Sequence, residues 1–249
     1  MTDDRRPDGE RAENLLRSSE FFRATSTRRA FMTRLMAAGG GAALGAGIGG
    51  GLLAQSGGLV AHAAGTDPVI AFGNAAVGAE RIAVAFYANA LGRDSKYSVE
   101  GDEAKGQLLN HGDRLYFEAA QQQEQAHEDT LVSLKLDFPY SVFSFPAGTF
   151  ASARNMLAFG EKLESIFIGA YLGAIKAAAS ETNTFIAEAA AQILGVECEH
   201  RALIREVAGD AVPNNRVFEG NLSPNGSTVY ATANDAVNAL LALGIKVVK

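Results

Sequence analysis

The sequence predicts an all-α protein, folded as an antiparallel four-helix bundle. Long alanine-rich stretches alternate with segments rich in turn-forming residues, and no run of residues shows the strict two-residue alternation of a half-buried strand. The four longest stretches would form helices of about 35 to 50 Å, which are the dimensions of such a bundle. A content of 47% hydrophobic and 20% charged residues is that of an ordinary globular protein.

The first two helices are delimited by capping and turn residues. We expect the first helix at Pro68–Leu91, because Asp67 can cap its N-terminus, a proline suits the first position, and Gly92 can end it. The second helix is expected at Glu103–Leu136. A loop rich in proline and glycine follows it and reaches Phe150.

The third and fourth helices are separated by a short break. The third is expected at Ala151–Ala179, and Ser180 with the following glutamate indicates a stop and a restart. The fourth is expected at Glu181–Ala208, where Gly209 can end it. The rest of the chain is rich in Asn, Pro, Gly and Ser, and we expect an irregular tail that ends in a short apolar helix near Ala231–Leu243.

The N-terminal segment has the pattern of an export signal. Residues 1–34 hold eight arginines and no lysine, and the stretch Leu35–Ala61 has no charged residue. Between them, Thr27-Arg28-Arg29-Ala30-Phe31-Met32 resembles the twin-arginine signal. Ala61-His62-Ala63 fits a small-x-small cleavage site. Residues 1–63 are therefore interpreted as a twin-arginine signal peptide, with an uncleaved N-terminal anchor as the alternative.

Cleavage would leave residues 64–249 as one domain, with a bundle core at about 67–209 and a C-terminal extension at 210–249. The signal holds eight of the 22 basic and six of the 28 acidic residues, so the net charge of the mature chain is near −8. No basic stripe interleaved with aromatic residues occurs, which argues against nucleic acid as a partner. We expect an exported protein, periplasmic or extracellular, that meets the twin-arginine machinery and has no membrane association after cleavage. That route carries folded proteins, often with a cofactor already bound.

Charged residues lie in the middle of the apolar stripes of the predicted helices. The first and third helices each place one glutamate there, and the second and fourth each place a glutamate and a histidine three residues apart, on one helix face. These six residues are Glu80, Glu124, His127, Glu164, Glu197 and His200.

Four carboxylates in one apolar interior would repel one another, and burying each costs several kcal/mol. Two divalent cations would neutralise the four negative charges. Carboxylate oxygens and imidazole nitrogens favour iron or manganese over a structural zinc, and a chain with one cysteine cannot build a thiolate cage. The alternative is a polar core network that is satisfied without metal.

The order Glu, Glu-x-x-His, Glu, Glu-x-x-His on four helices resembles the di-iron carboxylate site of the ferritin-like superfamily, over about Asp67 to Gly209. Tyr87 follows Glu80 by seven residues, and Tyr171 follows Glu164 at the same spacing. This pattern is similar to that of exported ferritin-like proteins grouped with desiccation-related proteins. The resemblance implies that the six residues named above are the metal ligands. The tyrosines are expected to fill the core, with a hydrogen bond to a ligand or electron donation as the alternative.

The resemblance also implies what the centre does. It implies two iron ions, with manganese as the alternative, and chemistry with dioxygen or peroxide. The leading hypothesis is a ferroxidase, or a protein of oxidative or desiccation stress. The rivals are peroxide disproportionation of the manganese catalase kind and a stress-protective helical bundle without enzymatic activity. A homo-oligomer is a further option.

Several other polar residues are given lesser roles. Glu161 lies one turn before Glu164 and is its alternative as a ligand, although exposure to solvent is expected. Cys198 is expected to be a buried, inert thiol. His111 and the run Gln121–Gln123 are expected on the surface.

Overall fold

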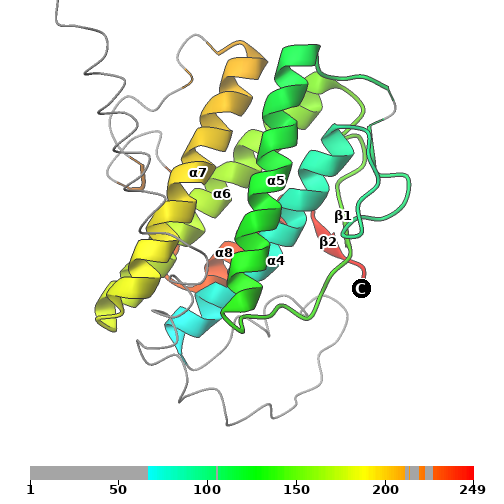
Figure 1. Ribbon diagram of the computed structural model, residues 1–249. Helices are drawn as coiled ribbons and strands as arrows, with labels where there is room; N and C mark the ends of the chain where they lie inside the picture. The colour runs from blue at the N-terminus through cyan, green and yellow to red at the C-terminus, as the bar shows by residue number, and fades with distance from the viewer. Residues whose placement is uncertain (1–66, 105, 211–212, 214–218, 222–226) are drawn as a thin grey trace, which may run out of the picture. The chain divides into compact units, whose positions relative to one another are not determined.

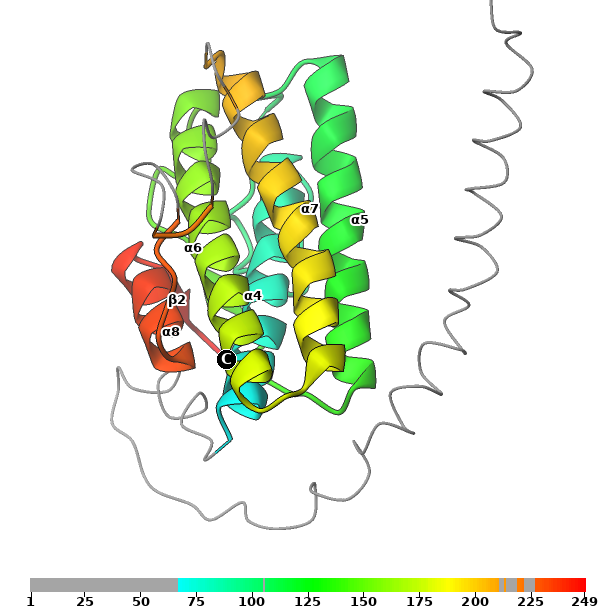
Figure 2. The same ribbon diagram turned by 90° about the vertical axis from the view of Figure 1, so that its left-hand side faces the viewer.

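The computed structural model describes residues 67–249, apart from 105, 211–212, 214–218 and 222–226. Within these residues four long helices run side by side (Figures 1 and 2). The predicted signal peptide, residues 1–63, lies outside the described residues. The four helices are α4 (Pro68–Ala90), α5 (His111–Ser133), α6 (Ala153–Ser180) and α7 (Thr184–Ala208).

A short fifth helix, α8 (Ala233–Ala242), packs against α6 and α4. Two strands of two residues each, β1 (Phe143–Ser144) and β2 (Lys246–Val247), form an antiparallel pair. They join the C-terminal end of the chain to the loop before α6. The predicted all-α bundle is confirmed. The small sheet was not predicted, because two residues are too few to show an alternating pattern.

Most of the predicted helix ends agree with the structure. The Asp67 side chain accepts hydrogen bonds from the backbone N–H groups of Val69 (2.8 Å) and Ile70 (3.4 Å), so the predicted N-cap of α4 is confirmed. Gly209 ends α7 with a φ of 83°, in the left-handed region that favours glycine. The observed bounds of α4, α6, α7 and α8 lie within three residues of the predicted ones.

The predicted start of the second helix at Glu103 is wrong. The helix α5 begins at His111, where the Asn110 side chain accepts a hydrogen bond from Asp113 N (2.9 Å) and caps the N-terminus. Gly106 has a φ of 101°, which an α-helix cannot contain. The predicted end at Leu136 is also three residues late, because Lys135 adopts a left-handed conformation with a φ of 66°.

The helix directions follow from the residues that face one another. Gly160 packs against Phe86, and Gly173 packs against Phe72, so α4 and α6 run in opposite directions. Polar contacts show the same reversed order. Arg81 of α4 and Arg93, which follows α4, pair with Glu128 and Glu118 of α5. Arg205 and Arg201 of α7 contact Glu161 and Ser165 of α6.

It follows that α5 and α6 run parallel to each other. The connection of residues 134–152 must therefore return along the length of the bundle before α6 begins. One such long crossover connection is the arrangement of ferritin-like bundles.

The C-terminal extension crosses α6 at two glycines. A Cβ atom at Gly169 would collide with the carbonyl oxygen of Thr228, and a Cβ atom at Gly173 would lie 2.5 Å from that of Tyr230. The backbone N–H of Tyr230 donates a hydrogen bond to the carbonyl oxygen of Gly169 (3.3 Å). The buried Arg201 on α7 donates a hydrogen bond to Ser227 Oγ (2.7 Å) and fixes the start of this crossing.

Replacing Gly169 with alanine is expected to destabilise the protein, because the new methyl group would displace backbone rather than a flexible side chain. We expect the free energy of unfolding to fall by about 1 to 3 kcal/mol, which is the usual cost of overpacking. Gly195 is the matched control, since it lies in α7 with no atom near its Cβ position. Gly195→Ala should raise stability by about 0.5 to 1 kcal/mol. Urea unfolding monitored by circular dichroism measures both, and equal effects would contradict this account of the crossing.

Two of the described helices, α4 and α6, are long and apolar enough to cross a membrane by length and composition alone. In the structure both belong to the bundle, and 67% and 50% of their most apolar windows are buried. Each also carries a buried glutamate, Glu80 and Glu164 respectively. Their apolar character therefore has an explanation in the packing of the bundle.

Candidate metal centre

All six residues singled out in the sequence lie together in the interior of the bundle. Five of the side chains are almost fully buried, with Glu80 2% exposed, His200 1% exposed, and the other three glutamates 0% exposed. His127 is the most accessible of the six, with a side chain 12% exposed. The placement arises because each helix turns its apolar stripe inward, and these residues occupy the centre of those stripes.

The six side chains form two overlapping groups of possible metal donors. Glu80 and His127 belong to the first group only, and Glu164 and His200 belong to the second only. Glu124 and Glu197 belong to both groups, and within each group one donor atom per residue lies within 4.8 Å of the others. The cluster therefore has the arrangement of two adjacent sites with two shared carboxylates. The ligand role of each residue stays a prediction.

Both imidazoles turn the same ring nitrogen toward the carboxylates. His127 Nδ1 lies 3.2 Å from both Glu80 Oε2 and Glu124 Oε2. His200 Nδ1 lies 3.0 Å from Glu124 Oε1 and 3.3 Å from Glu197 Oε2. Each histidine thus faces the glutamate one turn before it on its own helix and a glutamate of another helix.

Two tyrosines support the carboxylates from the opposite helices. Tyr87 on α4 donates a hydrogen bond to Glu164 Oε1 on α6 (2.5 Å), and Tyr171 on α6 donates one to Glu80 Oε1 on α4. Side chains lean toward the N-terminus of their own helix, and α4 and α6 are antiparallel, so each tyrosine meets the glutamate of its partner helix. The tyrosines therefore hold one oxygen of Glu80 and one of Glu164 in place.

Gln123 is a residue whose role the sequence interpretation missed, because it was expected on the surface with Gln121 and Gln122. Its Oε1 atom lies 2.9 Å from His200 Nε2. If Nε2 donates to this oxygen, the lone pair of Nδ1 is free on the side of the carboxylates. Gln123 thus orients His200. The only sequence signal was its place directly before Glu124.

A second polar network is formed around residues directly next to the cluster in the sequence. Arg81 Nε donates to Glu128 Oε1 (2.9 Å), and Tyr97 OH lies 2.6 Å from the same oxygen. Arg81 Nη1 also donates to the carbonyl oxygens of Phe138 (2.5 Å) and Tyr140 (3.1 Å). Because Arg81 follows Glu80 and Glu128 follows His127, this network fixes α4 against α5 next to the centre.

The charges of the metal-free cluster are divided unequally. Burial raises the pKa of Glu80 and of Glu164 well above the ordinary value, and neighbouring carboxylates add to the effect. Burial would also raise the pKa of Glu124, but His200 and His127 hold it well below its usual range. Burial would lower the pKa of both imidazoles, yet the surrounding glutamates raise it. Protons thus replace part of the positive charge that the cluster needs.

Three carboxylate oxygens of the cluster have no hydrogen-bond partner. Glu124 Oε1, Glu164 Oε2 and Glu197 Oε1 are buried and accept no hydrogen bond. Two of them lie near a histidine nitrogen, but outside hydrogen-bonding geometry. Buried carboxylate oxygens without a donor are costly, and they are the atoms that hard cations bind. The Glu and His cluster could therefore hold metal ions, and its donor set fits them.

The lesser candidates lie outside the two groups. Glu161, the alternative to Glu164, pairs with Arg205 Nε (2.7 Å) and its side chain is 39% exposed. His111 is exposed at the start of α5. Burial raises the pKa of Cys198 to about 11, so its thiol is protonated at neutral pH.

Comparison with known protein families matches residues 70–210 to the ferritin-like domain. The match covers more than half of the sequence and all six residues of the cluster. No curated protein and no solved structure gives a significant match. The bundle with its crossover connection, the inward Glu and His cluster and the family match agree, and the chain belongs to the ferritin-like domain family.

Proposed function

We propose that this protein binds two iron ions in the Glu and His cluster and oxidises ferrous iron with dioxygen. The observation that supports the proposal most is the pair of overlapping donor groups that share Glu124 and Glu197. Two carboxylates common to both groups would hold two ions close together. Four glutamates also balance the charge of two divalent ions.

The chemistry of the donors supports iron. Carboxylate oxygens and imidazole nitrogens suit ferrous and ferric ions, and the family match is to proteins with a ferritin-like domain. Bound iron would supply one-electron redox chemistry. Ferrous iron is also the substrate: two ferrous ions each lose one electron, and one dioxygen molecule takes up both electrons with two protons and leaves as hydrogen peroxide.

The residues of the chain position the donors and keep water away. Gln123 holds the ring of His200, and the two tyrosines each hold one oxygen of a glutamate. The carboxylates and imidazoles can release the protons that they carry in the metal-free protein when metal binds. His127, the most accessible of the six, marks the side from which an ion could reach the centre.

We also propose that the protein acts outside the cytoplasm, under oxidative or desiccation stress. The pattern of residues 1–63, with paired arginines, an uncharged stretch and a small-x-small site, supports export. The spacing of Glu80 with Tyr87 and of Glu164 with Tyr171, which is similar to that of desiccation-related proteins, supports the stress role. A twin-arginine route would allow the bundle to fold and bind iron before export.

Anaerobic titration with ferrous iron tests the proposal. We expect saturation at two ions per chain and, on admission of air, the near-ultraviolet absorption of ferric iron with release of hydrogen peroxide. Glu161→Gln should behave as the wild type, because this exposed glutamate pairs with Arg205 outside the cluster. Binding without oxidation would contradict the ferroxidase proposal. Oxygen evolution from peroxide by the manganese-loaded protein would favour the catalase alternative, and the absence of metal binding would favour the purely structural bundle.

A further inference from the structure

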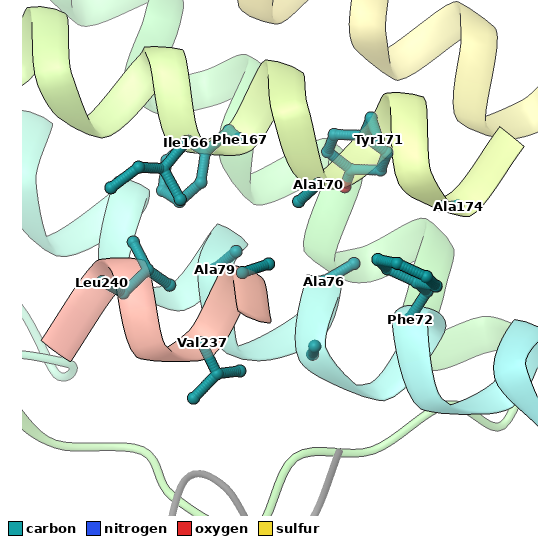
Figure 3. Close-up of a pocket in the computed structure, with 12 residues that line it drawn as sticks. Phe72, Ala76, Ala79, Ile166, Phe167, Ala170, Tyr171, Ala174, Val237 and Leu240 are labelled. Carbon is teal, nitrogen blue, oxygen red and sulfur yellow. The ribbon is translucent and has the colours of Figure 1, made fainter. Parts of the chain in front are cut away.

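A small pocket lies between α4, α6 and α8 (Figure 3). Its volume is about 20 Å³, which is room for one very small molecule. Figure 3 shows Ile166 and Phe167 of α6 and Leu240 of α8 at one end, and Phe72 of α4 and Tyr171 of α6 at the other. The pocket therefore joins the bundle to the C-terminal extension.

The lining of this pocket is almost entirely carbon. Its walls are formed by alanine, valine, leucine, isoleucine and phenylalanine side chains, with Tyr171 as the one residue that has a polar side chain. The hydroxyl group of Tyr171 donates its hydrogen bond to Glu80. A buried water needs two to four polar partners, so this pocket offers a poor site for water and an adequate one for an apolar molecule.

Tyr171 connects the pocket to the metal cluster. The ring of Tyr171 lines the pocket, and its hydroxyl group contacts Glu80. Ala79, the residue before Glu80, forms part of the opposite wall. A molecule held in the pocket would contact the ring of Tyr171, whose hydroxyl group contacts a glutamate of the cluster.

The pocket depends on the C-terminal extension. Ala236, Val237 and Leu240 of α8 form one of its three walls. These residues lie beyond residue 210, where the ferritin-like match ends. The crossing at Gly169 and Gly173 leads the chain over α6 to the position at which α8 covers the pocket. The extension thus adds a feature to the bundle that the family domain does not supply.

We propose that this pocket is a binding site for dioxygen, which it holds beside the metal centre. The inference rests on the proposed ferroxidase function, which needs dioxygen as the oxidant. Dioxygen is small, uncharged and apolar, and it matches the volume and the carbon lining. A pocket of about 20 Å³ is too small for a lipid or a large organic substrate, and a lining without an acidic side chain does not suit a metal ion.

Dissolved dioxygen is itself the probe, because it is paramagnetic and speeds the relaxation of nearby nuclei. The measurement uses metal-free protein under oxygen pressure, so it does not depend on iron oxidation. We expect strong relaxation enhancement at the methyl groups of Val237, Leu240 and Ile166. The methyl groups of Leu163, which is fully buried and does not line the pocket, should change little.

Variants that fill the pocket test whether it binds dioxygen for the oxidation of iron. Ala174→Leu places three carbon atoms in the pocket from α6, and Ala158→Leu is the same change on the exposed face of the same helix. The first variant should lose the enhancement and show a several-fold lower second-order rate constant of ferrous oxidation with dioxygen. The control should keep both. Ala76→Leu, on the opposite wall, repeats the test if the first variant does not fold.

The outcomes separate the two proposals. If the methyl groups around the pocket show no more enhancement than Leu163, the inference is wrong, whether or not the protein oxidises iron. If the pocket binds dioxygen but its filling leaves the rate constant unchanged, the proposed role beside the centre is wrong. If the wild type binds two ferrous ions without oxidising them, the ferroxidase proposal fails, and the relaxation measurement alone decides on the binding site.

Discussion

Glu124→Gln is expected to abolish stable binding at both metal positions, because Glu124 belongs to both donor groups. The amide keeps the volume of the side chain but removes its charge and one metal-binding oxygen. Loss of a supporting partner outside the ligand set already weakens metal binding by about 10- to 100-fold, so we expect a decrease of at least about 100-fold for each ion. Metal analysis after anaerobic equilibration with ferrous iron measures the stoichiometry.

Variants at the unshared glutamates sharpen this test. Glu80→Gln should lose the ion of the first group and keep the second, and Glu164→Gln should do the reverse. Glu161→Gln, one turn before Glu164, is the matched control and should keep both ions. Circular dichroism should show an unchanged helical content in all variants. Two ions bound to Glu124→Gln would contradict the shared-carboxylate arrangement, and loss of an ion in Glu161→Gln would reverse the choice between Glu161 and Glu164.

The helices could be predicted because their signals are local. Asp67 caps the backbone that immediately follows it, and Gly209 ends α7 through its own left-handed conformation. The start of α5 could not be placed, because Asn110 is also a common surface residue and the segment before it is polar enough to continue a helix. Only the conformation of Gly106 and the cap at Asn110 decide between the two.

The buried cluster could be predicted because helical spacing fixes the face of each residue. A charged residue in the middle of an apolar stripe must be buried, and this reasoning placed all six residues in the interior. The partners across helices could not be predicted, since they depend on helix order and direction. The contact of Gln123 with His200 and the crossed contacts of Tyr87 and Tyr171 belong to this class.

The path of the C-terminal extension could not be predicted either. Gly169 and Gly173 are ordinary members of a small-residue helix face until another segment crosses them. The sequence alone shows two glycines in α6, but not that another segment crosses them. The pocket between α4, α6 and α8 depends on this contact.

Metal is expected to stabilise the protein strongly, because it binds a site that exists only in the folded chain. At a free concentration one hundred times the Kd, one ion adds about 2.7 kcal/mol to the free energy of unfolding. For a domain of this size that corresponds to an increase in Tm of roughly 5 to 10 °C per ion. Thermal unfolding with and without manganese, which is stable in air, measures the increase, and Glu124→Gln should not show it.

The increase in Tm should also grow as the pH rises from 5.5 to 7.5. In the metal-free protein the pKa values of Glu80, Glu164, His127 and His200 are raised, so the stability that they contribute is present at low pH and is lost as the pH rises toward those values. The pKa of Glu124 is lowered, so its contribution is lost only in stronger acid and stays constant in this window. Metal binding displaces these protons. For each proton displaced, the affinity for metal falls by about tenfold when the pH falls by one unit. A metal-induced increase that is the same at both pH values would show that the ion binds outside this cluster, because surface carboxylates are already ionised throughout the window.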